Sequence, residues 1–191
     1  MKPEYKNAVL NRKKICHSYL NMQSCKKNFT VTDVTNDANL NRSTFYLHFK
    51  NLEDVKKHIE DELTNNFKEL ERSFRKVEID KTPEIIFNKL NEIILKDIKL
   101  YRLIIKAQGE YTLISKMKSY ILNAISNNFM IMRYVTNYEN FKTIVQYIVS
   151  GAIDTYMDWF KGNIDCTLEE LSDLLCRMIK GGLKGYLNYG Y

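Results

Sequence analysis

Hydrophobic residues recur at spacings of three and four along nearly the whole chain, the pattern of amphipathic helices. The strict alternation typical of half-buried strands is weak. Glycine is absent from the first 108 residues, and the only prolines are Pro3 and Pro83. The pattern therefore predicts an all-α fold of about nine helices.

The first part of the chain is predicted to hold four helices. The first spans residues 4–24, with Ile15 and Tyr19 among its inward positions. Two short helices follow between residues 30 and 49, and a longer one runs from 52 to 77. The middle of this longer helix is highly charged, which predicts a largely solvated connector.

Two later helix starts are marked by residues that satisfy free backbone N–H groups. Thr82 is expected to cap a helix whose first residue is Pro83, a position that proline favours. Thr167 and Glu170 form a T-x-x-E capping box, which predicts the start of the last helix.

Between these starts, the spacing of apolar residues predicts one long helix over residues 110–134. The polar stretch 137–140 is expected to be a loop, and a helix over 141–161 is expected to end at Gly162. This helix and the last one are both strongly apolar, although the chain already has material for a core. They are therefore candidates for a subunit interface, and Gly151 with Ala152 would let two helix backbones approach closely. The alternative is that both helices belong to the core of a monomer.

Residues 30–55 are the most informative stretch of the chain. Thr30 and Asp33 form a T-x-x-D pattern that starts a short helix. Asn39 stands where a tight turn needs a residue that tolerates left-handed backbone angles. In the second short helix, capped by Asn41, Phe45 and Phe49 lie four apart and are expected to face inward. This is the pattern of a helix-turn-helix.

The outward side of that second helix suits DNA, because it combines a cation with hydroxyl and aromatic groups. Arg42 is the strongest candidate for contact with a base edge, since bidentate pairing of Arg with guanine is the commonest specific contact. A phosphate contact is the alternative for Arg42. Ser43 and Leu47 are further base-facing candidates, Leu47 through apolar contact with a thymine methyl group.

This segment resembles the DNA-binding signature of the TetR/AcrR family of bacterial transcriptional repressors. Asn39 stands where the family usually has glycine, and Leu52 stands where many members have lysine. The departure at Leu52 removes one phosphate contact and leaves more of that task to Lys50. The matching elements are Phe29, Val31 to Val34, Ala38, Leu40, Ser43-Thr44-Phe45-Tyr46, His48-Phe49-Lys50 and Glu53 to Val55.

The resemblance implies two domains and a further set of contacts. Residues 1–51 are expected to form the DNA-binding domain, and residues 52–191 a helical regulatory and dimerisation domain. By resemblance, the contacts to the DNA backbone are Thr44, Tyr46, His48 and Lys50, joined by Thr32 near the start of the first short helix. The alternative for His48 is an ordinary surface histidine.

By resemblance, the larger domain senses a small molecule, whose identity the sequence does not give. Tyr101, Met117, Tyr156 and Trp159 are the predicted lining residues of its site, chosen from the aromatic and methionine positions of the helices. The alternative is that these side chains are ordinary core, because such stripes are more often core than pocket.

The function predicted from this resemblance is that of a ligand-responsive transcriptional repressor. Such a repressor would form a homodimer through its last two helices. The homodimer would bind a palindromic operator in double-stranded DNA, and the small molecule would release the protein from the DNA. Two recognition helices would enter successive major grooves about 34–36 Å apart. The alternative is a co-activator of similar fold that acts through a protein partner and binds DNA weakly alone.

Charge supports a nucleic-acid partner. The chain carries a net charge of +6. Residues 1–60 hold 11 Lys and Arg against 6 Asp and Glu, a balance of +5. Nearly all the excess positive charge therefore lies in residues 1–60, the part of the chain that contains the predicted helix-turn-helix, as expected for a surface that neutralises phosphates. A general solubilising bias is the alternative explanation.

Other chemistry finds no support in the sequence. His17, His48 and His58 are scattered and lack metal-ligand spacing, and no phosphate-binding glycine loop or nucleophile motif is present. We therefore expect no metal, no cofactor and no enzymatic activity. The N-terminus is polar, no apolar run approaches the ~20 residues of a membrane span, and the four cysteines lack a C-x-x-C pair. These features predict a cytoplasmic protein with free thiols.

Overall fold

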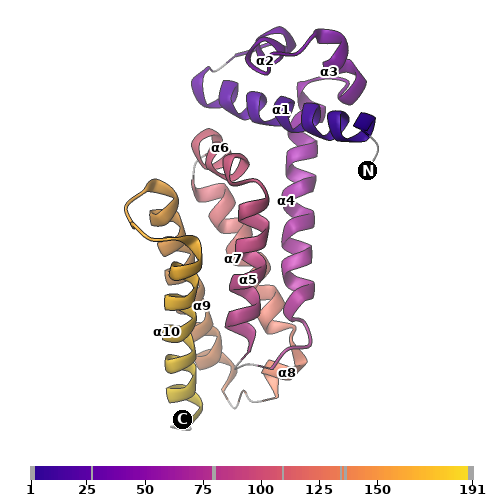
Figure 1. The fold of residues 1–191 in the computed structure, drawn as a ribbon. Helices are drawn as coiled ribbons and strands as arrows, with labels where there is room; N and C mark the ends of the chain where they lie inside the picture. The colour runs from indigo at the N-terminus through magenta and orange to yellow at the C-terminus, as the bar shows by residue number, and fades with distance from the viewer. Residues whose placement is uncertain are drawn as a thin grey trace. The chain divides into compact units, whose positions relative to one another are not determined.

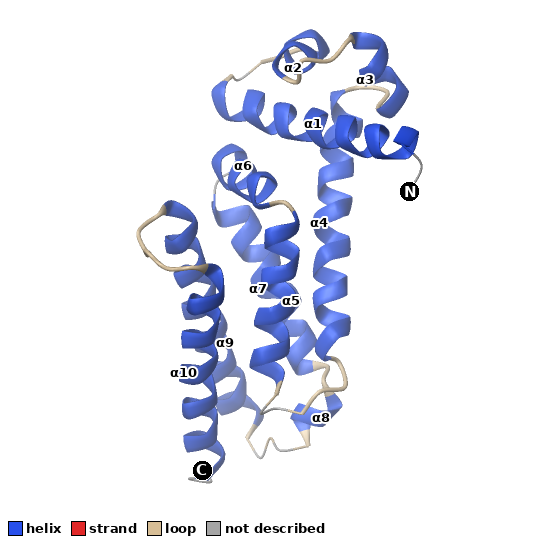
Figure 2. Ribbon diagram, in the orientation of Figure 1, coloured by secondary structure: helices blue, strands red, loops and turns tan. Residues whose placement is uncertain are grey.

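A computed structural model describes residues 3–26, 28–78, 81–108, 110–133, 135 and 137–188. In this part of the chain the backbone forms ten α-helices (Figure 1) and no strand (Figure 2). Nine of the helices have seven or more residues, and the remaining one is a single turn of four. The predicted all-α fold of about nine helices is confirmed.

The helices follow one another in the order shown by the labels of Figure 1. They are α1 (Pro3–Cys25), α2 (Val31–Asp37), α3 (Arg42–His48), α4 (Leu52–Phe74), α5 (Thr82–Lys96), α6 (Ile98–Gln108), α7 (Glu110–Ser126), α8 (Phe129–Met132), α9 (Tyr138–Lys161) and α10 (Leu168–Asn188).

Contacts divide the chain into two compact units. Unit 1 comprises Met1–Asn65 and Asp97–Leu113, and unit 2 comprises Asn66–Lys96 and Ile114–Tyr191. Unit 1 thus contains α1, α2, α3, α6 and the first part of α4. Unit 2 contains α5, α8, α9, α10 and most of α7. The predicted functional division between residues 1–51 and 52–191 is a separate matter and stays a prediction.

The core of unit 1 forms where α1 packs against α2, α3 and α6, and where α2 packs against α3. Burial of aliphatic and aromatic side chains drives this packing, at about 1.5–3 kcal/mol for each large side chain. Among the described residues of unit 1, the apolar side chains with essentially no exposed surface are Ile15, Leu20, Val34, Phe45, Val55, Ile59 and Ile104.

Asp97 joins α1 to the start of α6. Its carboxylate accepts a hydrogen bond from His17 Nε2 at 2.9 Å and forms an ion pair with Lys13 Nζ at 3.1 Å. It also accepts the backbone N–H of Leu100 at 3.1 Å. Burial raises the pKa of Asp97, but the hydrogen bonds from His17 and Lys13 outweigh it, so the net pKa is lowered.

Because the pKa of Asp97 is lowered by folding, its charged form stabilises unit 1 above the usual carboxyl pKa of about 3.9, and this contribution disappears as pH falls through the lower native value. We expect Asp97→Asn to reduce the free energy of unfolding by about 1–2 kcal/mol at pH 7. The difference should shrink below about pH 4. Urea denaturation at pH 7 and pH 3 measures it. The exposed carboxyl of Asp165 supplies the control, Asp165→Asn. An equal loss in both variants would contradict the prediction.

Unit 2 is built around α5, α9 and α10, with α10 packed against both α5 and α9. The start of α10 follows the prediction closely. The Thr167 N–H donates to Glu170 Oε2 at 2.8 Å, and the Glu170 N–H donates to Thr167 Oγ1 at 3.2 Å. At the end of α9, Gly162 adopts a left-handed φ of 80°, which favours glycine and stops the helix as predicted.

The expectation that α4 is a largely solvated connector is wrong. Its residues Leu63, Phe67, Leu70 and Phe74 are all buried. Their spacing of four, three and four places them on one face of the helix, while the charged residues occupy the other face. The segment therefore combines a high charge with an apolar stripe, and the stripe determines which face is buried.

The predicted single helix over residues 110–134 is also wrong, because it breaks after Ser126. Asn128 is fully buried, and its side-chain amide donates to the carbonyl oxygens of Phe74 at 2.7 Å and Val77 at 3.2 Å. The Phe74 carbonyl belongs to the last residue of α4 and the Val77 carbonyl lies three residues further on, and such carbonyls need partners when buried. The chain therefore leaves the helix so that Asn128 can reach them. Tyr134, the last residue of the predicted helix, lies outside the described residues.

Three helix starts differ from the prediction. Residues 138–140 are not a loop, since α9 begins at Tyr138 with Asn137 as its cap, accepting the N–H of Asn140 at 3.0 Å. Thr82 lies inside α5, and its hydroxyl donates to the Glu78 carbonyl at 2.8 Å instead of capping. Asn41 occupies the cap position of α3, but its side chain makes no capping hydrogen bond.

Candidate nucleic-acid interface and apolar cavity

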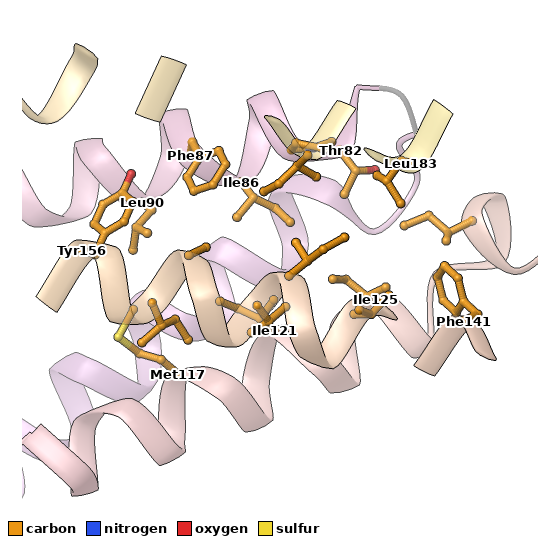
Figure 3. A pocket seen from close by; sticks show the side chains of 18 residues that line it. Thr82, Ile86, Phe87, Leu90, Met117, Ile121, Ile125, Phe141, Tyr156 and Leu183 are labelled. Carbon is orange, nitrogen blue, oxygen red and sulfur yellow. The ribbon is translucent and has the colours of Figure 1, made fainter. Parts of the chain in front are cut away.

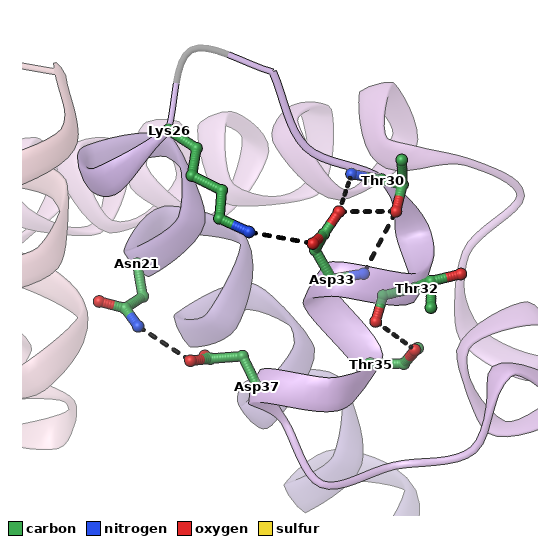
Figure 4. Close-up of polar contacts among 7 residues, drawn as sticks. All are labelled: Asn21, Lys26, Thr30, Thr32, Asp33, Thr35 and Asp37. Atoms are coloured by element: carbon green, nitrogen blue, oxygen red, sulfur yellow. Dashed lines mark hydrogen bonds and ion pairs between the residues drawn. The ribbon is translucent and has the colours of Figure 1, made fainter.

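The start of α2 is fixed by the predicted capping box (Figure 4). The Thr30 N–H donates to Asp33 Oδ2 at 2.8 Å, and the Asp33 N–H donates to Thr30 Oγ1 at 3.3 Å. Lys26 Nζ pairs with Asp33 Oδ1 at 3.1 Å. The side-chain and backbone hydrogen bonds from Thr30, followed by Lys26, lower the pKa of Asp33 to about 2. The box therefore stays charged and closed across the ordinary pH range.

The turn between α2 and α3 has the geometry expected for a helix-turn-helix. Asn39 adopts a left-handed φ of 51°, as its position in the sequence predicts. The Leu40 N–H then donates back to the Thr35 carbonyl at 2.9 Å. Asn21 on α1 donates to Asp37 Oδ1 at 3.0 Å and ties the end of α2 to α1 (Figure 4).

Helix α3 separates an inward aromatic side from an outward mixed side. Phe45 and Phe49 are buried, with ring centroids 6.0 Å apart. On the other side Leu47 is 82% exposed, so its apolar side chain is available for contact outside the chain. The remaining predicted contacts on α3 are exposed (Arg42, Ser43 and Tyr46) or half-buried (Thr44 and His48).

Arg42 and Tyr46 form a pair along the outward side of α3. The Arg42 guanidinium lies 6.0 Å from the centroid of the Tyr46 ring, and its Nη2 donates to the Tyr46 hydroxyl at 3.4 Å. This contact between a cation and an aromatic face limits the conformations of a long side chain. Both groups stay exposed, so the pair presents several hydrogen-bond donors in a restricted position.

Lys50 follows α3 in the short connection to α4. Its backbone N–H donates to Asp54 Oδ2 at 3.0 Å, and the Asp54 N–H donates to Asn51 Oδ1 at 2.9 Å. These bonds fix the backbone, while the Lys50 side chain remains exposed. Thr32 is likewise exposed in the first turn of α2.

His48 lies beside residues that the sequence did not connect with it. Burial, followed by the charge of Arg12, lowers the pKa of His48, which favours its neutral form at pH 7. Arg12 of α1 and Lys57 of α4 line the same surface hollow as His48. The sequence does not connect Arg12 with His48, because the two residues lie 36 positions apart. No local spacing signals such a contact.

Unit 2 contains an apolar cavity of about 90 Å³ (Figure 3). It lies among side chains from α5, α7, α8, α9 and α10, 18 of which line it. Of the four predicted lining residues, Met117 and Tyr156 belong to it. Tyr101 is instead buried in unit 1, and the indole of Trp159 donates to the Cys166 carbonyl at 2.8 Å.

Most of the lining was missed by the sequence interpretation, which concentrated on aromatic residues and methionine. Seven of the 18 lining residues are isoleucines, among them Ile86 of α5, Ile121 of α7 and Ile148 of α9. The available signal was that several helices carry isoleucine stripes at helical spacing. Such stripes also describe an ordinary core, so the sequence alone does not separate the two.

A buried chain of hydrogen bonds connects the cavity wall to α10. The Tyr156 hydroxyl donates to Asn91 Oδ1 at 2.8 Å, and Asn91 Nδ2 donates to Ser172 Oγ at 2.8 Å. The Phe87 ring is stacked on Tyr156, with centroids 5.9 Å apart. Burial raises the pKa of Tyr156, so the phenol is neutral and acts as a hydrogen-bond donor.

Across the described ranges, no cluster of three or more His, Cys, Asp or Glu residues is arranged to hold a metal ion. None of the described helices combines the length and apolarity needed to cross a membrane. The four cysteines are free thiols, and burial raises the pKa of Cys16 to about 12, so nothing here marks it as reactive.

Comparison with known proteins identifies the family. A family model described as a transcriptional regulator C-terminal region, of the TetR family, matches residues 81–181, which is more than half of the chain. The chain therefore belongs to the TetR family of transcriptional regulators, and membership of this family points to a regulator of transcription rather than an enzyme. No curated protein matches it. The match runs from the start of α5 into α10, whereas the resemblance rested on residues 29–55, so two separate parts of the chain indicate the same family.

Proposed function

We propose that this protein is a ligand-responsive transcriptional repressor that binds a palindromic operator as a homodimer and is released by a small molecule. The observation that carries the DNA-binding part is the outward side of α3. There, a preorganised Arg42–Tyr46 pair and an 82% exposed Leu47 stand on a helix anchored by buried Phe45. An uncovered leucine beside a restricted guanidinium is suited to base edges in a major groove.

The proposed contacts divide by chemistry. Arg42, Ser43 and Leu47 read base edges, through hydrogen bonds and through contact with a thymine methyl group. The contacts with phosphate and sugar come from Thr32, Thr44, Tyr46, His48 and Lys50, which set the register of the protein on the duplex. His48 contributes as a neutral donor, given its lowered pKa.

The homodimer is supported by exposed apolar surface on the last two helices. Tyr147 of α9 is 80% exposed, and Leu174 and Met178 of α10 are also exposed one turn apart. Gly151, one turn after Tyr147, has nothing within 4 Å of a Cβ placed on it. Exposed apolar side chains on two helices that pack together are suited to a partner, and two-fold symmetry matches the palindrome of an operator.

Ligand control is supported by the cavity, because its walls include the two helices proposed for dimerisation. A ligand that binds one dimer geometry more tightly than another shifts the population between them, by no more than its difference in affinity. In this proposal, residues 1–51 bind DNA and residues 52–191 sense the ligand and dimerise. A DNA-bound repressor of this class acts in the cytoplasm.

The function is tested by titrating the protein with DNA from just upstream of its own gene, against shuffled DNA, over a series of salt concentrations. We expect preference for the upstream DNA and a steep loss of affinity with salt. Lys50→Ala should weaken binding to all sequences and reduce the salt slope by about 1. Arg42→Ala should instead lose about 1–3 kcal/mol of discrimination at one position of each half-site.

The two variants check each other, because both remove one exposed cation from the same surface. If Arg42→Ala lowers affinity equally for every site variant, Arg42 contacts phosphate and not a base. Equal and weak binding of the wild-type protein to both DNAs would contradict autonomous operator recognition. The co-activator that needs a protein partner would then be favoured, in agreement with the apolar Leu52 at the first position of α4.

A further inference from the structure

The geometry of the cavity in unit 2 points to the chemical class of the effector. We infer that the cavity binds an uncharged, apolar molecule no larger than about one aromatic ring or a short alkyl chain. The inference that this molecule acts as an effector rests on the proposed ligand-responsive function. The chemistry of the cavity itself rests only on its walls.

The lining of the cavity presents no polar surface. Only two of the 18 lining residues, Thr82 and Tyr156, carry a polar side-chain group. The Thr82 hydroxyl donates to the Glu78 carbonyl at 2.8 Å, and the Tyr156 hydroxyl donates to Asn91 Oδ1 at 2.8 Å. Both donor protons are therefore committed outside the cavity.

The hydrogen-bond chain behind Tyr156 is itself complete. Asn91 Nδ2 donates to Ser172 Oγ at 2.8 Å, and the Ser172 hydroxyl donates to the Glu169 carbonyl at 2.8 Å. Releasing Tyr156 to bind a ligand would leave the Asn91 carbonyl oxygen buried without its donor. Such a loss costs about 1–3 kcal/mol. A polar ligand group thus gains little from Tyr156.

A charged ligand is expected to bind still more weakly than a polar one, because no lining side chain carries a charge. An ion moved from water into such a site loses its hydration and finds no partner. The volume sets the size limit. At about 90 Å³ the cavity is smaller than the ~150 Å³ apolar cavity known to hold benzene, so one ring already requires small side-chain shifts.

Toluene, benzoate and benzylammonium have nearly the same shape but differ in charge. Comparing the three probes therefore isolates the effect of ligand charge on binding. The full-length protein is labelled at isoleucine methyl groups and titrated with each probe by NMR. Toluene should produce saturable shifts at lining residues such as Ile86, Ile121 and Ile148. Ile15 and Ile59 of unit 1 serve as internal controls and should not move. The charged probes should bind on the order of 100-fold more weakly or not at all.

Two variants on α9 locate the site independently. Ala152→Phe places a ring in the cavity and should abolish the toluene shifts, whereas Gln146→Phe adds the same ring at an exposed position outside it and should leave them unchanged. If Ala152→Phe does not fold, the titration of the wild-type protein with the three probes still tests the inference. Equal binding of charged and neutral probes, or toluene shifts confined to residues outside the cavity, would overturn the inference.

The same samples distinguish this inference from the proposed function. Toluene that binds the cavity and lowers affinity for the upstream DNA supports both. Toluene that binds the cavity and leaves DNA affinity unchanged supports the cavity chemistry and contradicts ligand release by this class. Specific DNA binding with no apolar ligand in the cavity overturns the inference while the DNA-binding part of the function stands.

Discussion

Replacing Phe45 by alanine is expected to reduce the free energy of unfolding by about 3–5 kcal/mol. Phe45 has no exposed surface, and its ring contacts those of Tyr46 and Phe49. Unit 1 is small, so a cavity of this size removes a large share of the 5–15 kcal/mol that stabilises a typical domain. We expect loss of specific DNA binding to accompany the loss of stability.

Leu47→Ala is the matched control, since Leu47 lies on the same seven-residue helix but is 82% exposed. Its effect on stability should stay within about 0.5 kcal/mol. Urea denaturation followed by circular dichroism reports both units. The fluorescence of Trp159, the single tryptophan, reports unit 2. Equal midpoints for the two variants would show that α3 is not anchored through Phe45.

Two helix starts and one turn could be predicted from the sequence because each depends on neighbours a few residues apart, whereas the starts of α5 and α9 differ from the prediction. The capping boxes at Thr30 and Thr167 and the left-handed Asn39 are examples. Their partners lie within three residues, so the spacing of residue types contains the whole interaction. The inward positions of Phe45 and Phe49 follow in the same way from helical spacing.

Interactions between residues distant in sequence could not be predicted in this way. Asn128 breaks the long helix because it binds the carbonyl of Phe74, 54 residues earlier. Asp97 draws Lys13 and His17 of α1 to the start of α6 from about 80 residues away. In both cases a polar side chain satisfies groups that only the folded chain brings near, and neither residue stands in a recognisable motif.

The candidate sites show the same difference between local and long-range interactions. The outward residues of α3 could be named in advance, because one helix presents them together. The cavity required four longer helices and one short one to meet, and its lining residues resemble ordinary core. Only the folded structure shows that Ile121 and Ile148 leave space between them and other side chains. Of the predicted lining residues, Met117 and Tyr156 reach the cavity because their helices contribute to it.

Replacing Met178 by arginine is expected to convert the proposed dimer into a monomer at micromolar concentration. Met178 is 66% exposed in the single chain, so arginine there has little effect on the fold of unit 2. In an interface between two copies of α10, two-fold symmetry would bury the new charge twice without a partner. Such burial costs several kcal/mol, which corresponds to a dimer weaker by on the order of 100-fold or more. Sedimentation equilibrium measures this directly.

Leu95→Arg tests whether the effect belongs to α9 and α10 or to any exposed apolar residue of unit 2. Leu95 is 61% exposed but lies on α5. We expect it to leave the mass of the particle unchanged. The monomeric Met178→Arg protein should also lose roughly 100-fold or more in operator affinity, because the second half-site is no longer bound intramolecularly. If both variants sediment like the wild type, the exposed surface of α10 serves another partner. If the wild type is already monomeric, a palindromic operator requires assembly on the DNA itself.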